Sequence, residues 1–146
     1  MSVARKPKGI DIVPDPQNVL ILETEVFPDY HRVHIEDFDT SDGAESGESA
    51  CTHTDHSVLV KTITSDEAID SDTDIRVRIY KGTSEHSLGE PIYSGELTLD
   101  SGYLAVGNSE DTIAKCPFEL GETIHLQIFA DRPSAAREVN VLIDPK

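Results

Sequence analysis

Side chains that can ligate metals gather in one short segment, where Cys51, His53, Asp55 and His56 fall within six positions. Thiolate, imidazole and carboxylate groups are the ligands that Zn²⁺ and other transition metals prefer. The spacing matches no established paired-ligand pattern, and on a strand His53 and Asp55 would face away from His56. Two interpretations therefore stay open: a metal site at His53, Asp55 and His56, or a polar loop before a strand that begins at Ser57.

Two further motifs resemble metal sites in part. His31 and His34 are three residues apart, a spacing that turns side chains to opposite faces of a strand, so surface or interface histidines are favoured. Residues 70–74 begin like a calcium loop, with aspartate at every second position. An EF-hand needs glycine next and glutamate at its twelfth position, where this chain has Ile75 and Lys81. A solvated acidic turn is favoured, with a weak Ca²⁺ site as the alternative.

Motifs for nucleophilic catalysis are missing from the sequence: it has no G-x-S-x-G, no phosphate loop with lysine and no H-E-x-x-H. Cys116 and His125 are residue types that can act as nucleophile and base, but nothing in the sequence places them together. A buried structural thiol at Cys116 is favoured. The sequence predicts neither a catalytic centre nor a cofactor, and a metal-dependent or carboxylate-based enzyme is the alternative.

The charge of the chain limits its partners. The sequence has 28 Asp and Glu against 12 Lys and Arg, a formal net charge of -16. Phosphates and anionic lipids attract clustered Lys and Arg, so direct nucleic-acid binding and membrane binding are disfavoured. A basic protein partner, a cation or a high-salt habitat fits this charge. The chain has two cysteines and no apolar run near the ~20 residues of a membrane span, and Pro14 and Pro16 lie where a signal peptide would be apolar. We therefore expect a cytoplasmic location.

Hydrophobic and polar residues alternate along most of the chain, most clearly at 75–80, where three aliphatic side chains alternate with two arginines and a tyrosine. The predicted strands cover residues 18–27, 30–35, 57–63, 75–80, 91–99, 102–106, 123–129 and 138–143. About eight short strands separated by turn residues predict an all-β fold, a single antiparallel β-sandwich with acidic loops. Segments 111–115 and 134–138 are the candidates for a helical turn, and Asp100-Ser101-Gly102 predicts a hairpin.

We divide the chain into a flexible N-terminal arm at 1–12 and a β-sandwich domain at 13–146, with an acidic loop at 36–56. Acids are densest at 36–48, which holds six and is expected to be mobile, and at 66–74, which holds five. The candidate partner-binding residues are the acids Glu36, Asp37, Asp39, Asp42, Glu45, Asp66, Glu67 and Asp70. Because the edges of a sandwich are open to pairing, a dimer stays an alternative to a monomer.

Three segments carry a resemblance to a known family: residues 26–35, with Tyr30-His31-Arg32-Val33-His34-Ile35 at their end, residues 94–97, and residues 120–126. In layout over 19–143 the chain resembles small bacterial β-sandwich proteins, the competence-associated nuclease inhibitors of the ComJ type. It departs from them in its acidic insertion at 36–48 and its lack of tryptophan. The resemblance implies a non-catalytic protein that binds and blocks a partner such as a nuclease, and it assigns no individual residue.

The leading functional prediction is a non-catalytic acidic binding protein, an inhibitor or immunity-type blocker of a basic partner such as a nuclease. A nuclease surface is basic because it binds phosphates, so an acidic inhibitor gains steering and charge complementarity. Two alternatives stay open. One is a metal-dependent enzyme or metal-binding β-sandwich, and the other is a structural or assembly module of a halophilic host.

Overall fold

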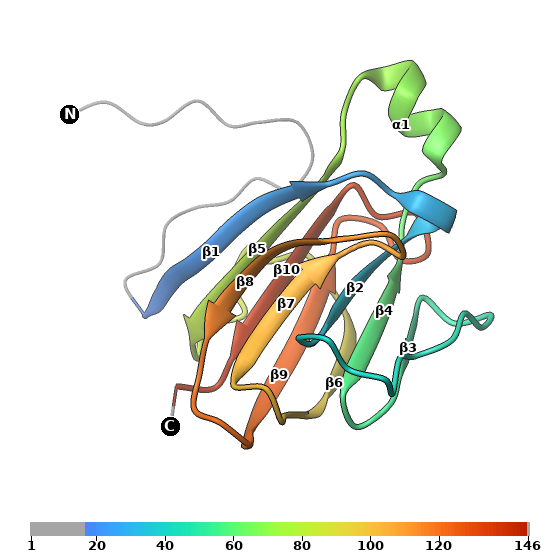
Figure 1. Ribbon diagram of the computed structural model, residues 1–146. Helices are drawn as coiled ribbons and strands as arrows, with labels where there is room; N and C mark the ends of the chain where they lie inside the picture. The colour runs from blue at the N-terminus through green and yellow to red at the C-terminus, as the bar shows by residue number, and fades with distance from the viewer. Residues whose placement is uncertain (1–16, 146) are drawn as a thin grey trace.

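Two five-stranded sheets pack face to face in the computed structural model, which describes residues 17–145 (Figure 1). The strand order is β1-β5-β10-β9-β6 in the first sheet and β3-β4-β2-β7-β8 in the second. The predicted all-β sandwich is therefore confirmed. The predicted arm at 1–12 lies outside the described residues.

The strands of each sheet and the two short helical elements have the following bounds. The first sheet contains β1 (Asn18–Val26), β5 (Ile75–Gly82), β6 (Glu90–Leu99), β9 (Glu122–Ala130) and β10 (Glu138–Ile143). The second sheet contains β2 (Arg32–Asp37), β3 (Cys51–His53), β4 (Ser57–Lys61), β7 (Tyr103–Gly107) and β8 (Thr112–Pro117). A 3-10 turn, η1 (Asp29–His31), precedes β2, and the helix α1 (Ser65–Ser71) connects β4 to β5.

The strand count and one pairing differ from the prediction. The described residues form ten strands rather than about eight, because β3 and β8 were missed. Both are edge strands with few buried side chains, so neither shows clear hydrophobic alternation. The predicted helical turn at 111–115 lies largely in β8, whereas the helix forms at 65–71. The β5–β10 pair is parallel, so the sandwich is mostly but not wholly antiparallel.

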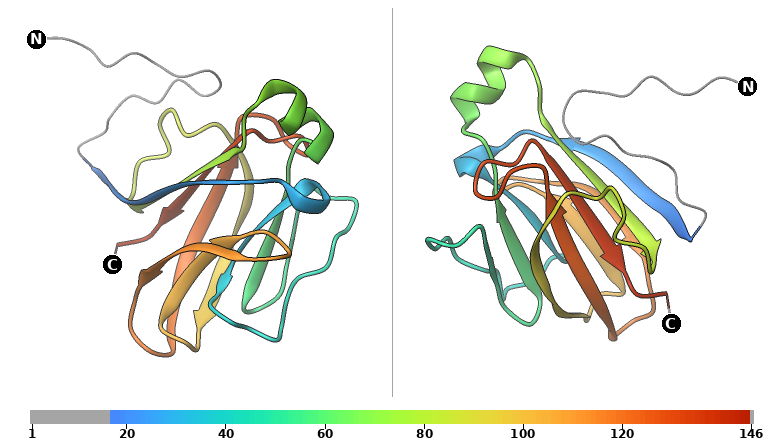
Figure 2. Two further views of the ribbon diagram at one scale, coloured as in Figure 1. Left: turned by 45° about the horizontal axis from the view of Figure 1, so that its top comes forward. Right: turned by 180° about the vertical axis from the view of Figure 1, so that it is seen from behind.

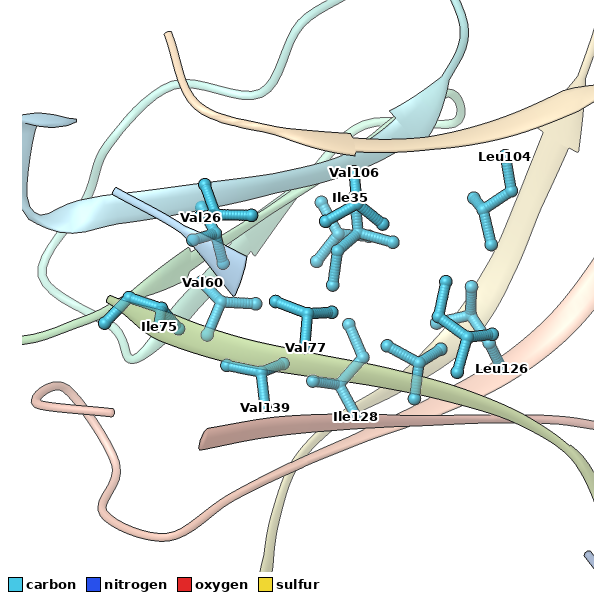
Figure 3. Close-up of a cluster of buried hydrophobic side chains, with 14 of the residues drawn as sticks. Val26, Ile35, Val60, Ile75, Val77, Leu104, Val106, Leu126, Ile128 and Val139 are labelled. Atoms are coloured by element: carbon cyan, nitrogen blue, oxygen red, sulfur yellow. The ribbon is translucent and has the colours of Figure 1, made fainter. Parts of the chain in front are cut away.

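The core lies between the inner faces of the sheets. Val77, Ile128 and Val139 from the first sheet point toward Ile35 and Val60 from the second (Figure 3). All five side chains are inaccessible to solvent. Burying aliphatic surface stabilises a fold by about 25 cal/mol per Å². Each alternating strand therefore packs its apolar face into this layer.

The turn at residues 100–102 links the two sheets instead of closing a hairpin. β6 pairs with β9, and β7 pairs with β2 and β8, so the strands on either side of the turn do not pair with each other. Gly102 has a φ of +81°, and a Cβ there would lie 3.2 Å from the Cα of Leu120. The sequence correctly predicted a turn at these residues. A turn alone does not determine which strands pair with each other.

The helix α1 stands at one end of the sandwich, and the turn between β6 and β7 lies at the opposite end (Figures 1 and 2). Features near α1 and features near this turn are therefore separate surfaces. Within residues 17–145, no helix has the length and apolar character needed to cross a membrane.

Candidate functional site

The eight acids predicted as partner contacts fall into two regions of the fold. The first region is β2 with the loop at 38–50, and the second is α1. The first contains Glu36, Asp37, Asp39, Asp42 and Glu45, and the second contains Asp66, Glu67 and Asp70. The sequence predicted these eight acids as one set of exposed carboxylates, but the surroundings of the individual side chains differ.

Asp37 and Glu36 are engaged within the protein. The Asp37 side chain is 3% exposed, and its Oδ1 accepts hydrogen bonds from the backbone N–H of Ser101 at 2.9 Å and from its hydroxyl at 2.7 Å. Glu36 Oε1 accepts a hydrogen bond from the Ser57 hydroxyl at 2.8 Å. The expectation that Asp37 is an exposed contact is wrong, because β2 continues through it and buries it beside the turn at 100–102.

The loop at 38–50 is hydrogen-bonded to β3 and to the turn that follows it. The Thr54 hydroxyl donates to the carbonyl of Asp42 at 2.7 Å, and the Thr52 hydroxyl donates to the carbonyl of Glu45 at 2.7 Å. Asp39, Asp42 and Glu45 are exposed. These bonds attach the backbone at Asp42 and Glu45, and the mobility expected for 36–48 stays a prediction.

His56 lies between two carboxylates from different segments. Its Nδ1 is 2.9 Å from Asp42 Oδ2, and its Nε2 is 3.2 Å from Asp100 Oδ2. The hydrogen bond to Asp42 and the charges of Asp100, Asp42 and Asp37 raise the pKa of His56, while partial burial opposes them. The His56 ring therefore connects the acidic loop to the turn between β6 and β7.

The structure does not gather the predicted metal ligands into one site. The His53 ring packs on Tyr93 with 5.0 Å between centroids, whereas His56 contacts Asp42. Asp55 is exposed, and its backbone carbonyl accepts a hydrogen bond from the Thr98 N–H at 2.9 Å. In the part of the chain that the structure describes, no group of three or more His, Cys, Asp or Glu side chains is arranged to hold a metal ion.

The two cysteines are free thiols in apolar surroundings. Burial raises the pKa of Cys51 to about 12 and that of Cys116 to about 11. Cys116 is buried on β8, whereas His125 is exposed on β9, so the Cys–His pair considered from the sequence does not form. A thiol with a raised pKa is a poor nucleophile at neutral pH, which matches the structural role expected for Cys116.

The second acidic region is organised by the N-terminus of α1. Thr64 caps the helix: its hydroxyl accepts from the Glu67 N–H at 3.0 Å, and Glu67 Oε1 accepts from the Thr64 N–H at 2.9 Å. This is a capping box, and it lowers the pKa of Glu67. Glu67 is therefore structural as well as exposed, whereas the side-chain carboxylates of Asp66 and Asp70 are exposed and make no hydrogen bond to another described residue.

Exposed apolar side chains lie beside the carboxylates at the end of α1. Phe27 is 37% exposed and Ile69 is 65% exposed. Together with Glu25, Asp72 and Asp74, and with Ala68 and Thr73, they line a shallow hollow that we call the α1 face. Neither Phe27 nor Ile69 was predicted as a site residue, although the isoleucine inside a run of acids was visible in the sequence.

The carboxylates of the α1 face reinforce one another's negative potential. Partial burial, with Glu25 and Asp72 nearby, raises the pKa of Asp74. Asp72 ends the helix with a left-handed φ of 55°. Asp72 and Asp74 therefore place negative charge beside the exposed side chains of Phe27 and Ile69, while Glu25 pairs with Arg76.

Arginines on the outer face of β5 are neutralised by neighbouring strands. Arg76 lies 2.9 Å from Glu25, and Arg78 lies 2.8 Å from Glu23 on β1 and 3.1 Å from Glu138 on β10. The carboxylates that balance these arginines come from β1 and β10, the two strands that pair with β5.

Comparisons with known proteins agree with the fold. No protein-family model matches the chain, and no curated protein sequence matches it. The fold is similar to the crystal structure of ComJ from Bacillus subtilis, an inhibitor of the DNA-degrading activity of NucA. The similarity has a TM-score of 0.59, covers 87% of this chain and 97% of ComJ, and comes with 8% sequence identity. The predicted ComJ-like resemblance is confirmed at the level of the fold.

Proposed function

We propose that the protein is an inhibitor-type binding protein that covers the surface of a basic partner such as a nuclease. The observation that carries the proposal is the α1 face, where exposed Phe27 and Ile69 lie among Glu25, Asp72 and Asp74. Apolar anchors supply much of the energy of protein interfaces, and surrounding charges select the partner and speed the encounter.

The fold similarity supports an inhibitor over an enzyme. ComJ is described as an inhibitor of the DNA-degrading activity of NucA, and it shares the sandwich layout over nearly its whole length. A nuclease must attract phosphates, so its working surface is positive and complementary to the α1 face. The two free thiols, Cys51 and Cys116, favour a reducing compartment, and we place the protein in the cytoplasm.

The proposal is tested by immobilising the protein and exposing it to extract of the source cells. We expect retention of a basic nuclease whose activity falls when the purified protein is added back. Retention should be lost between about 0.01 M and 1 M salt, because the screening length then falls from about 30 to about 3 Å. Retention unchanged over this range, or an unaffected nuclease, would overturn the proposal.

A matched pair of variants locates the surface. Ile69→Ser removes an anchor of the α1 face, and Leu120→Ser removes a side chain that is 81% exposed in the loop between β8 and β9. Because both side chains are exposed, we expect both variants to fold with the stability of the wild type. Ile69→Ser should weaken partner binding at least about tenfold, as for an interface anchor, and Leu120→Ser should leave it unchanged. Equal effects of the two substitutions on partner binding would exclude the α1 face as the binding surface.

High-salt adaptation is the alternative explanation of the acidity. Such a protein needs salt to screen repulsion between its carboxylates, so it should unfold in dilute buffer and fold in molar salt. A binding protein with localised acidic surfaces should stay folded in both. Circular dichroism in low and high salt distinguishes the two explanations.

A further inference from the structure

A hollow of about 380 Å³ opens on the outer face of the second sheet, where the start of β2 lies beside the end of β4. Its cationic lining residues are Arg32 and Lys61. Hydroxyl groups come from Ser46 and Ser49 of the acidic loop, from Thr52 of β3 and from Thr64 before α1. We call this the Arg32 hollow.

The two cations of the Arg32 hollow occupy paired positions on neighbouring strands. Arg32 and Lys61 are directly opposite in the antiparallel β2–β4 register, and like charges in this position repel. Among residues 17–145, neither forms an ion pair, whereas Arg76 and Arg78 each pair with carboxylates. A positive spot thus persists in a chain whose formal net charge is -16.

Arg32 also has a donor that the protein leaves unused. Its Nε is buried and has no hydrogen-bond partner among residues 17–145, although its Nη1 donates to the hydroxyl of Ser46. The ring of Tyr30 lies over the guanidinium, 5.7 Å from centroid to Cζ. Buried donors without an acceptor are rare in proteins, so this N–H marks a place where an external acceptor is favoured.

Unusual backbone conformations surround the same hollow. Tyr30 has a φ of 55°, His31 of 64° and Ser134 of 67°, and all three residues line it. They are three of the six non-glycine residues with positive φ in the described chain. Such conformations are costly for residues with side chains, and they gather where a fold holds groups for binding.

We propose that the Arg32 hollow binds a phosphate group. The planar guanidinium of Arg32 matches two oxygens of an oxyanion, the ammonium of Lys61 supplies a second charge, and the hydroxyls supply further donors. Glu67 is the acidic lining residue, and its Oε1 already accepts the Thr64 N–H. This site does not depend on the α1 face or on the proposed inhibitor function.

The test is a titration of the full chain with inorganic phosphate, followed by ¹H–¹⁵N NMR against chloride at equal ionic strength. We expect saturable shifts at 30–32, 46–49 and 61–64, with a dissociation constant on the order of 1 mM. Arg32→Gln and Lys61→Gln should each weaken binding about tenfold, since each removes a charged donor. Lys115→Gln removes an exposed cation on β8 outside the hollow and should leave binding unchanged.

A variant that should strengthen phosphate binding provides a second test. Glu67→Gln keeps a capping-box residue at this position but removes the negative charge of the lining, so phosphate should bind roughly twofold to fivefold more tightly. Glycerol 3-phosphate, titrated in parallel, identifies a phosphate ester as the ligand if it binds more tightly than inorganic phosphate. Shifts that do not saturate, or that persist unchanged in both Arg32→Gln and Lys61→Gln, would overturn the proposal.

Discussion

The imidazole Nδ1 of His56 lies 2.9 Å from the carboxylate of Asp42, so the turn between β3 and β4 contacts the acidic loop. The opposite ring nitrogen lies 3.2 Å from Asp100, directly after β6. The ring of His56 therefore connects the acidic loop with a turn from a distant part of the sequence.

This contact predicts a pH-dependent stability. The pKa of His56 is raised in the folded state, so its stabilising contribution is complete below its ordinary value of about 6.5 and is lost as pH rises through the raised value. Urea midpoints at about pH 5.5 and about pH 8.5 should differ more in the wild type than in His56→Gln. His86→Gln changes an exposed histidine in the 83–89 loop and should keep the wild-type difference. An equal difference in His56→Gln and the wild type would contradict the role of His56.

The cap of α1 predicts a measurable loss of stability. Thr64→Ala removes the hydroxyl that accepts the Glu67 N–H and should destabilise the protein by about 1 kcal/mol. Ser65→Ala removes a neighbouring hydroxyl that makes no hydrogen bond with a described residue, so it should cost much less. Urea unfolding of both variants measures the difference, and equal losses would show that the cap does not stabilise α1.

The arginines of β5 should differ in their contribution to stability. The Arg78 side chain is 8% exposed and contacts Glu138, which is 6% exposed, so Arg78→Leu breaks an ion pair with a buried carboxylate and should cost about 3 kcal/mol or more. Arg76 is 34% exposed, and Arg76→Leu should cost about 1 kcal/mol or less. Guanidinium unfolding compares the two variants. A larger loss of stability for Arg76→Leu than for Arg78→Leu would show that burial does not determine which arginine contributes more.

The thiols should be protected in the folded protein. Because burial raises the pKa of both cysteines, little thiolate is present at about pH 8. We expect iodoacetamide to modify Cys51 and Cys116 far more slowly in the native protein than in urea, as measured by mass spectrometry over time. Native Cys51 that reacts at the unfolded rate would show that its surroundings open readily.

Most strands with apolar–polar alternation were predictable from the sequence, whereas β3 and β8 were not. Residues 75–80 became the first six residues of β5 because their aliphatic side chains alternate and face the core. β3 has no buried side chain and β8 buries Cys116 alone, so neither shows an alternating apolar pattern. The helix α1 buries Ala68 alone and so has no periodic apolar face, but Thr64 and Glu67 carried its capping-box signal.

Contacts between distant segments explain what the sequence could not reveal about the sites. Nothing local shows that Asp42 and Asp100 meet at His56, or that Glu23 and Glu138 neutralise Arg78. These pairs depend on strand order and register, which alternation does not encode. The acidic segments were visible from composition, whereas their division into internal and exposed carboxylates required the fold.

The place of β10 has a consequence for how the molecule folds. It lies parallel to β5 and antiparallel to β9, and it separates the β1–β5 pair from the β6–β9 pair. Without β10, no pairing of described strands would join these two pairs into one sheet. Closing such long-range pairings is slow, so refolding is expected in milliseconds to seconds.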